Sequence, residues 1–223
     1  MLEINLLITH MEAINRAILI PDWLTVMLFS SFILLVFLKA LNPHKFFTVV
    51  SSIVNKGFLE IESEEKISPF NLFNLGFTLF SLSSISLAVY FSFIYIQNES
   101  IEIESYYSMV LLILVYMTGR FLIEFLIMNL FSVKSYLNVF FLSKRIYLFS
   151  ISIGIWIFVL LYAYGEQSIF VLWAGSAILF CIRLLSILST NKNLIFNNLF
   201  YFILYLCSFE IAPLLILYKV MTK

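Results

Sequence analysis

The chain has 223 residues, of which 62% are hydrophobic and 12% charged, and 13 lysines and arginines balance 13 aspartates and glutamates. Soluble domains are nearer half apolar and a quarter charged, so this composition excludes an ordinary soluble protein and indicates a chain surrounded by lipid. The zero net charge favours no nucleic-acid partner, and the two isolated cysteines, Cys181 and Cys207, make no disulfide framework.

Six stretches are long and apolar enough to cross a hydrocarbon core of about 30 Å, which takes about 20 helical residues. The predicted spans are residues 23–41, 70–96, 106–130, 146–164, 168–189 and 195–218. We therefore predict an all-α, polytopic membrane protein with six transmembrane helices in one integral membrane domain, residues 1–223.

Two shorter segments show helical amphipathic patterns between the spans. In residues 43–57, apolar side chains recur at helical spacing opposite a basic and hydroxyl face, with Asn42 as the expected cap. Residues 132–143 repeat the pattern. We predict that both form cytoplasmic helices lying in the headgroup plane, with membrane lipid as their partner; docking to another protein is the alternative.

Small residues indicate where the spans pack together. Ser81, Ser84 and Ala88 share one face of the second span, and the fifth span contains the run AGSA at residues 174–177. Because small side chains let helices approach closely in lipid, we interpret these as packing seams and not as binding sites.

The distribution of basic residues predicts the orientation. Nine basic residues lie on one side of the predicted membrane, namely Lys39, Lys45, Lys56, Lys66, Lys134, Lys144, Arg145, Arg183 and Lys192. The other side has Arg16, Lys219 and Lys223, and its loop NESIEIES holds three glutamates. By the positive-inside rule, the side with nine is cytoplasmic and both termini are periplasmic.

Four ionisable residues fall at membrane depth, and these are Arg120, Glu124, Arg183 and Glu210. Such groups cost about 2.5 to 3.5 kcal/mol each at a helix centre, so they should face the bundle interior and find partners. Depths counted at about 1.5 Å per residue favour two pairs, Glu124 with Arg183 and Arg120 with Glu210. An internal pair between Arg120 and Glu124 competes, and snorkelling to the interface is the simpler account of Arg183.

Pro213 interrupts the sixth span one turn after Glu210. A proline lacks the backbone donor, so the span should kink there and open a small polar cavity beside the carboxyl group. In a transporter this cavity would be a proton or cation site, and in an assembly protein a socket for a neighbouring helix. The simplest interpretation of these intramembrane polar residues is structural: they bind one another inside the bundle and fix the register of the helices.

No motif predicts catalysis. Both histidines, His10 and His44, lie outside the predicted spans, and the sequence has no HExxH, GxSxG or glycine-rich phosphate loop. We predict no metal, no cofactor and no enzymatic activity, although a lone carboxyl group acting on lipid as a general base stays as a third hypothesis.

The C-terminal stretch YLCSFEIAPLLILYK, residues 205–219, resembles a family of bacterial inner-membrane proteins described as a domain of unknown function, as do PDW at 21–23 and NPHKFF after the first span. The resemblance implies an integral inner-membrane protein of a Gram-negative bacterium with no assigned reaction. Such bacteria often run type IX secretion and gliding machinery. By analogy of setting, the resemblance therefore also implies a role beside that apparatus.

From the residues, the leading hypothesis is a non-enzymatic assembly or accessory component that works with another inner-membrane protein or as a homo-oligomer. The alternative is a small transporter or proton-conducting subunit. In that alternative Glu210 is the protonatable group, Pro213 the hinge and Arg120 the counter-ion.

Overall fold

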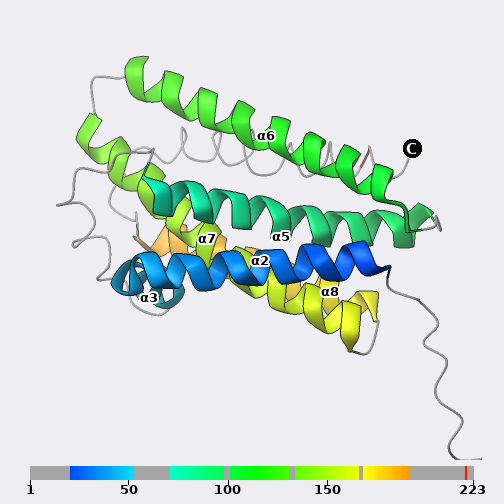
Figure 1. Ribbon diagram of the computed structural model, residues 1–223. Coiled ribbons are helices and arrows are strands. Elements are labelled where there is room, and N and C mark those ends of the chain that lie inside the picture. Colours follow the sequence, from blue (N-terminus) through cyan, green and yellow to red (C-terminus); the bar gives the residue numbers. More distant parts are fainter. Residues whose placement is uncertain are drawn as a thin grey trace, which may run out of the picture.

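The computed structural model describes residues 21–52, 71–97, 101–130, 134–165, 168–190 and 219, with the side chains of 124–130, 134–142 and 190 excepted. This part of the chain is helical. Its helices are α2 (Asp22–Leu41), α3 (Pro43–Ser51), α5 (Leu72–Gln97), α6 (Ile103–Leu130), α7 (Lys134–Tyr164) and α8 (Ile169–Thr190). Figure 1 shows the five long helices side by side along one common direction, with α3 at one end.

Five of these helices are long and apolar enough to cross a membrane, and they coincide with the first five predicted spans. The all-α, multi-pass class is therefore confirmed for the described residues. The sixth predicted span, residues 195–218, lies outside them. The first helix begins at Asp22 with Pro21 as its N-cap, so Asp22 occupies the first turn and complements the positive end of the helix dipole.

One helix differs from its prediction. Residues 134–142 were expected to belong to a separate interfacial helix, but they continue without a break into the fourth span as α7. The sequence explains this, because no proline or glycine occurs between Lys134 and Gly154. With 31 residues, α7 is about 46 Å long and therefore longer than a hydrocarbon core requires.

The centre of the bundle is the pair α5 and α7. Helix α5 packs against α2, α6, α7 and α8, while α7 packs against α3, α5, α6 and α8. Aromatic side chains fill the space between them: the rings of Phe77 and Phe149 are stacked with centroids 5.1 Å apart, and both are buried. Offset aromatic pairs of this kind add to the dispersion attraction that replaces the hydrophobic effect in lipid.

The described spans differ in the share of their residues that is buried inside the bundle. In the most apolar stretch of α7, 56% of the residues are buried inside the bundle, compared with 17% in α6. Figure 1 shows α6 along one edge of the bundle, with α5 between it and α2. Of the five described spans, α6 is therefore the one with the smallest buried share.

Candidate functional site

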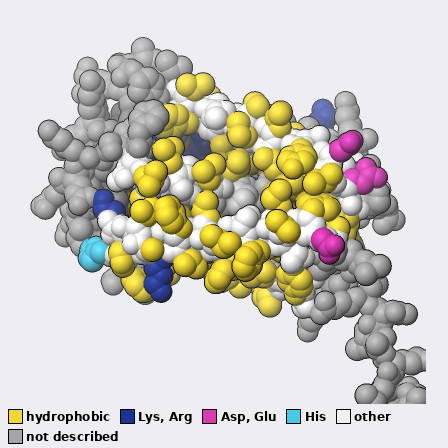
Figure 2. All heavy atoms as spheres, viewed as in Figure 1, with side chains coloured by type: hydrophobic (Ala, Val, Ile, Leu, Met, Phe, Trp, Pro, Cys, Tyr) yellow, Lys and Arg dark blue, Asp and Glu magenta, His cyan; other side chains and the backbone are white. Residues whose placement is uncertain are grey.

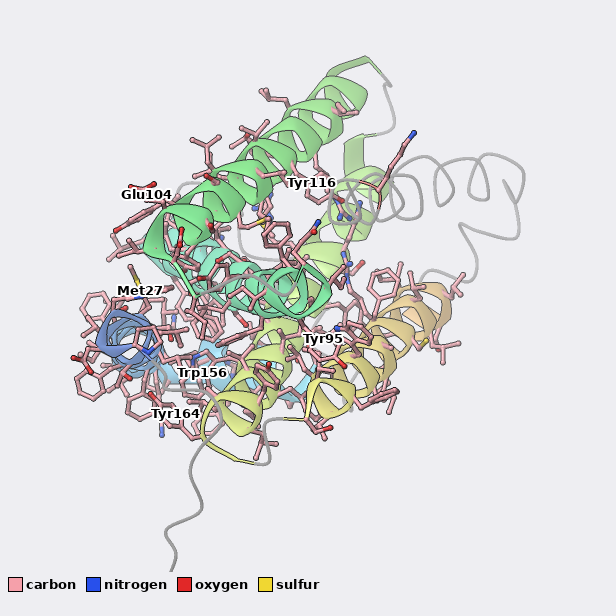
Figure 3. All side chains as sticks on the ribbon, turned by 90° about the vertical axis from the view of Figure 1, so that its right-hand side faces the viewer. Met27, Tyr95, Glu104, Tyr116, Trp156 and Tyr164 are labelled. Carbon is pink, nitrogen blue, oxygen red and sulfur yellow. The ribbon has the colours of Figure 1, made fainter. Side chains whose placement is uncertain are left out.

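Several serine hydroxyl groups of α2, α5 and α7 are buried inside the bundle, and we call them the serine seam: Ser31, Ser81, Ser84 and Ser152. Ser84 Oγ of α5 donates a hydrogen bond of 2.8 Å to the backbone oxygen of Ser152 on α7. The indole Nε1 of Trp156 donates to Ser31 Oγ of α2 at 2.7 Å, and Figure 3 shows Trp156 among the side chains at the centre of the bundle. These two bonds tie α2, α5 and α7 together.

The serine seam is a packing device and offers no reactive group. Ser31 Oγ itself donates to the backbone oxygen of Leu28 at 2.7 Å, and Ser152 Oγ donates to that of Phe149 at 2.7 Å. Each hydroxyl proton is thus held by a carbonyl, which satisfies the requirement that polar groups in lipid be hydrogen-bonded internally. The predicted packing role of Ser81 and Ser84 is confirmed, because both are fully buried.

Of the AGSA run on α8, Gly175 packs as predicted, whereas Ala174 and Ala177 are exposed. A methyl group placed on Gly175 would lie 2.6 Å from ring atoms of Phe158 on α7, and one on Gly154 would lie 2.7 Å from Leu179 Cδ1 on α8. Both glycines therefore let α7 and α8 approach closely. Sequence reasoning missed Gly154, Ser31 and Trp156, because a single small or polar residue in an apolar run does not reveal its partner helix.

Acidic side chains gather at one end of the bundle and most of the visible basic ones lie toward the other, with one basic side chain beside the acidic ones (Figure 2). At one end, the Trp23 ring near the start of α2 lies 5.5 Å from the ring of Tyr106 on α6, so Asp22, Glu102 and Glu104 belong to the same region, which we call the acidic end. The other end, which we call the basic end, contains Lys39, His44, Lys45, Lys144 and Arg145. Lys144 is only 3% exposed there, an unusual burial for a lysine.

Arg120 lies on α6 toward the basic end. Its Nη1 donates to the Tyr116 hydroxyl at 3.4 Å, and the neighbouring ring of Phe121 is 5.6 Å from Arg145 Cζ on α7. Tyr116, labelled in Figure 3, points from α6 toward the interior of the bundle. The phenol and the ring give these two guanidinium groups polar and cation–π contacts at this end.

Arg183 is more buried than Arg120, the other predicted site residue whose side chain is described, and has 5% of its surface exposed. It lies 14 residues after the first residue of α8 and seven before the last, so its Cα is about 10 Å inside the basic end of that helix. Since Gly154 faces Leu179 and α7 and α8 are antiparallel, Arg183 lies near the level of Ser150, one turn earlier on α7. Simple snorkelling to the interface does not describe a guanidinium group buried to this degree.

The two predicted ion pairs remain predictions. Glu124 lies on α6 one turn beyond Arg120, but its side chain is outside the described part, and Glu210 and Pro213 lie outside the described residues altogether. Figure 3 shows α6 and α8, which carry Arg120 and Arg183, on different sides of α5. Within the described residues, no group of three or more His, Cys, Asp or Glu side chains is placed to hold a metal ion.

One surface of α6 was not foreseen from the sequence. Of the four glycines within the described helices, Gly76, Gly154 and Gly175 each face a side chain closely enough to clash with a Cβ atom, whereas Gly119 on α6 has nothing within 4 Å of that position. Large apolar side chains of the same helix, such as Leu111 and Val115, are 65% and 59% exposed. We call the surface formed by Leu111, Val115, Gly119 and Leu122 the α6 outer face.

Comparison with known protein families agrees with this architecture. Residues 24–221 match the model of a family described as a domain of unknown function, DUF4271. No curated protein and no solved structure matches the chain. Because the family model covers nearly the whole sequence, this multi-pass membrane protein belongs to the DUF4271 family.

Proposed function

We propose that this protein is a non-enzymatic component of the bacterial inner membrane that assembles with another integral membrane protein through the α6 outer face. The observation that carries the proposal is the open position at Gly119. Glycine in a helix interior costs about 1 kcal/mol relative to alanine. In the other described helices that cost is offset by close packing, and at Gly119 the packing partner would come from outside this chain's described residues.

The surroundings of Gly119 suit a transmembrane helix as the partner. Thr118 is exposed beside it, and its hydroxyl bonds to the backbone oxygens of Leu114 and Val115 on α6 itself. Small and hydroxyl-bearing residues with large apolar neighbours are the usual composition of helix–helix contacts in lipid. A helix could approach Gly119 at backbone distance with Leu111, Val115 and Leu122 on either side of it.

The proposal includes a topology of six spans, with the basic end in the cytoplasm and both termini in the periplasm. Its support is the separation of charge between the basic end and the acidic end, together with the positive-inside rule. In this arrangement α3 lies at the cytoplasmic interface. The proposed setting of this assembly is beside type IX secretion or gliding machinery, and no residue of this chain is assigned to a contact with that machinery.

The experiment is a mild-detergent purification of the tagged protein from its own host at native expression, followed by mass spectrometry of what travels with it. Wild type is compared with Gly119→Leu, which fills the open position. The matched control is Ala177→Leu on α8, which adds similar bulk at an exposed position of another helix. A stoichiometric membrane partner retained by wild type and by the control, and lost with Gly119→Leu, is the expected result.

A lone protein in all three samples would overturn the proposal. The competing function, a small transporter with Glu210 as its protonatable group, would then be tested by flux into proteoliposomes. In that case Glu210→Gln should abolish flux while the protein still folds, because the amide keeps the shape of the side chain and loses its charge.

A further inference from the structure

Helix α3 lies across the basic end of the bundle. The chain leaves α2 at Leu41, and Asn42 makes the corner: its backbone N–H donates to Leu38 O at 3.3 Å, and its Oδ1 accepts from the backbone N–H of Lys45 at 3.1 Å. Pro43 then occupies the first turn of α3. Figure 1 shows α3 nearly end-on beside the end of α2, and Figure 3, turned by 90°, shows α2 end-on instead. The two axes are therefore strongly crossed, and α3 runs roughly in the plane of the membrane surface.

One face of α3 is fixed to the bundle. Val49 is buried, the Phe46 ring lies 6.0 Å from that of Phe77 on α5, and Ser52 at the end of the helix is also buried. The helix packs against both α2 and α7. Because this inward face is anchored on the bundle, the position of the opposite face is set by the fold.

The opposite face of α3 combines apolar and basic groups. Phe47 is 59% exposed and Val50 is 43% exposed, and His44 is exposed one turn before Phe47. Lys39 at the end of α2 holds its Nζ 5.6 Å from the centre of the Phe47 ring, a cation–π geometry. We call this surface, formed by Lys39, His44, Phe47 and Val50, the α3 outer face. Lys45 is half-buried and lies on the inward side of the helix, one turn before the buried Val49.

The charges on this face have the wrong sign for the helix that carries them. The N-terminus of a helix favours acidic neighbours, but the first turn of α3 has no acidic residue and instead carries His44 and Lys45. The positive end of the dipole, Lys45 and the nearby Lys39 thus add their potentials in one place. An anion bound there would be favoured by all of them.

We propose that the α3 outer face is a binding site for anionic phospholipid headgroups of the cytoplasmic leaflet. Phe47 and Val50 enter the region between headgroups and acyl chains, while Lys39 contacts the phosphate oxygens and Lys45 adds its charge at the first turn of α3, as basic residues of amphipathic helices at a membrane surface do. The site depends on the crossed position of α3 and not on the proposed partner of α6. It would fix the depth and tilt of the bundle relative to the cytoplasmic surface.

The test is electron spin resonance of the full chain reconstituted in phosphatidylcholine vesicles, with spin-labelled phosphatidylglycerol or phosphatidylcholine as the probe. The measured quantity is the ratio of the two lipids' association constants with the protein. Wild type should prefer the anionic lipid. Attraction of about 1 kcal/mol per lysine near a membrane surface corresponds to about a fivefold ratio, so Lys39→Gln should lower the preference by up to about fivefold and Lys39→Gln/Lys45→Gln further.

Lys219→Gln is the matched control, because Lys219 is exposed and the sequence predicts it on the opposite side of the membrane. It removes the same charge and should leave the ratio near that of wild type. If Lys219→Gln lowered the ratio as much as Lys39→Gln does, the preference would follow from the net charge of the protein alone, and the proposed site would be overturned. A wild-type ratio of one, or a ratio unchanged by Lys39→Gln, would also overturn it. Lys39 is exposed, so the single variant serves if the double variant folds poorly.

Discussion

Helices α6 and α7 have similar lengths, 28 and 31 residues, and both are apolar enough to span a membrane, yet they use that character differently. Helix α7 is mostly buried in its span, its Gly154 faces Leu179, and its Ser152 carbonyl accepts a bond from α5. Helix α6 is mostly exposed, and among the described residues its Gly119 faces no side chain and its Thr118 bonds within α6 itself. In lipid, therefore, the positions of small residues distinguish an internal helix from a peripheral one better than hydrophobicity does.

The largest expected effect comes from breaking the α7 side of this comparison with Gly154→Leu. A Cβ atom at Gly154 would already lie 2.7 Å and 3.1 Å from the two terminal carbons of Leu179, so a leucine must push α8 away. Overpacking of this kind lowers the free energy of unfolding by about 3 kcal/mol. The thermal unfolding midpoint in detergent should fall accordingly, and an unchanged midpoint would contradict the contact between α7 and α8.

A second prediction concerns the bond between Trp156 and Ser31, which joins α7 to α2. Trp156→Phe and Ser31→Ala should each destabilise the protein, and the double variant should be more stable than the sum of the two changes predicts. The coupling free energy should be about 0.6 kcal/mol and at most about 1.7 kcal/mol, the range of hydrogen bonds between membrane helices. A double-mutant cycle on unfolding in detergent measures it, and a coupling of zero would mean that the bond contributes nothing.

The sequence was sufficient for the fold class and the first five spans, because their hydrophobicity is a property of each segment alone. It also identified Ser81, Ser84 and Gly175 as packing positions, because small residues share a helix face or stand together there. It did not reveal that α7 is continuous across residues 134–164. The amphipathic pattern at the start of this helix predicts a separate helix, although no proline or glycine separates it from the span. Partner choice, as between Trp156 and Ser31, depends on which helices are neighbours, and that information is not local. The ion pairs of Arg120 and Arg183 stay predictions.

A smaller effect separates two adjacent serines of α5. Ser84 donates to α7, whereas Ser83 donates to the Phe80 backbone oxygen of its own helix. Ser84→Ala should lower the free energy of unfolding by about 0.6 kcal/mol. The loss is modest because the Ser152 carbonyl keeps its place in the hydrogen-bond ladder of α7. Ser83→Ala should leave the free energy of unfolding in detergent unchanged. Equal losses in both variants would mean that the bond between α5 and α7 stabilises the protein no more than a hydrogen bond within α5.

The smallest expected effect on stability is that of Gly119→Leu, the same substitution as at Gly154 but on the exposed helix. A Cβ atom added at Gly119 would meet none of the described residues within 4 Å, and leucine is a better helix former than glycine by up to about 1 kcal/mol. The unfolding midpoint of the purified protein should therefore stay level or rise slightly, while Gly154→Leu falls. A fall at Gly119 equal to that at Gly154 would mean that α6 is packed as tightly as α7 and would remove the basis for a partner on its outer face. A level midpoint combined with loss of a co-purifying protein would assign Gly119 to an interface between proteins, because the added leucine would then disturb the partner and leave this chain's own fold unchanged.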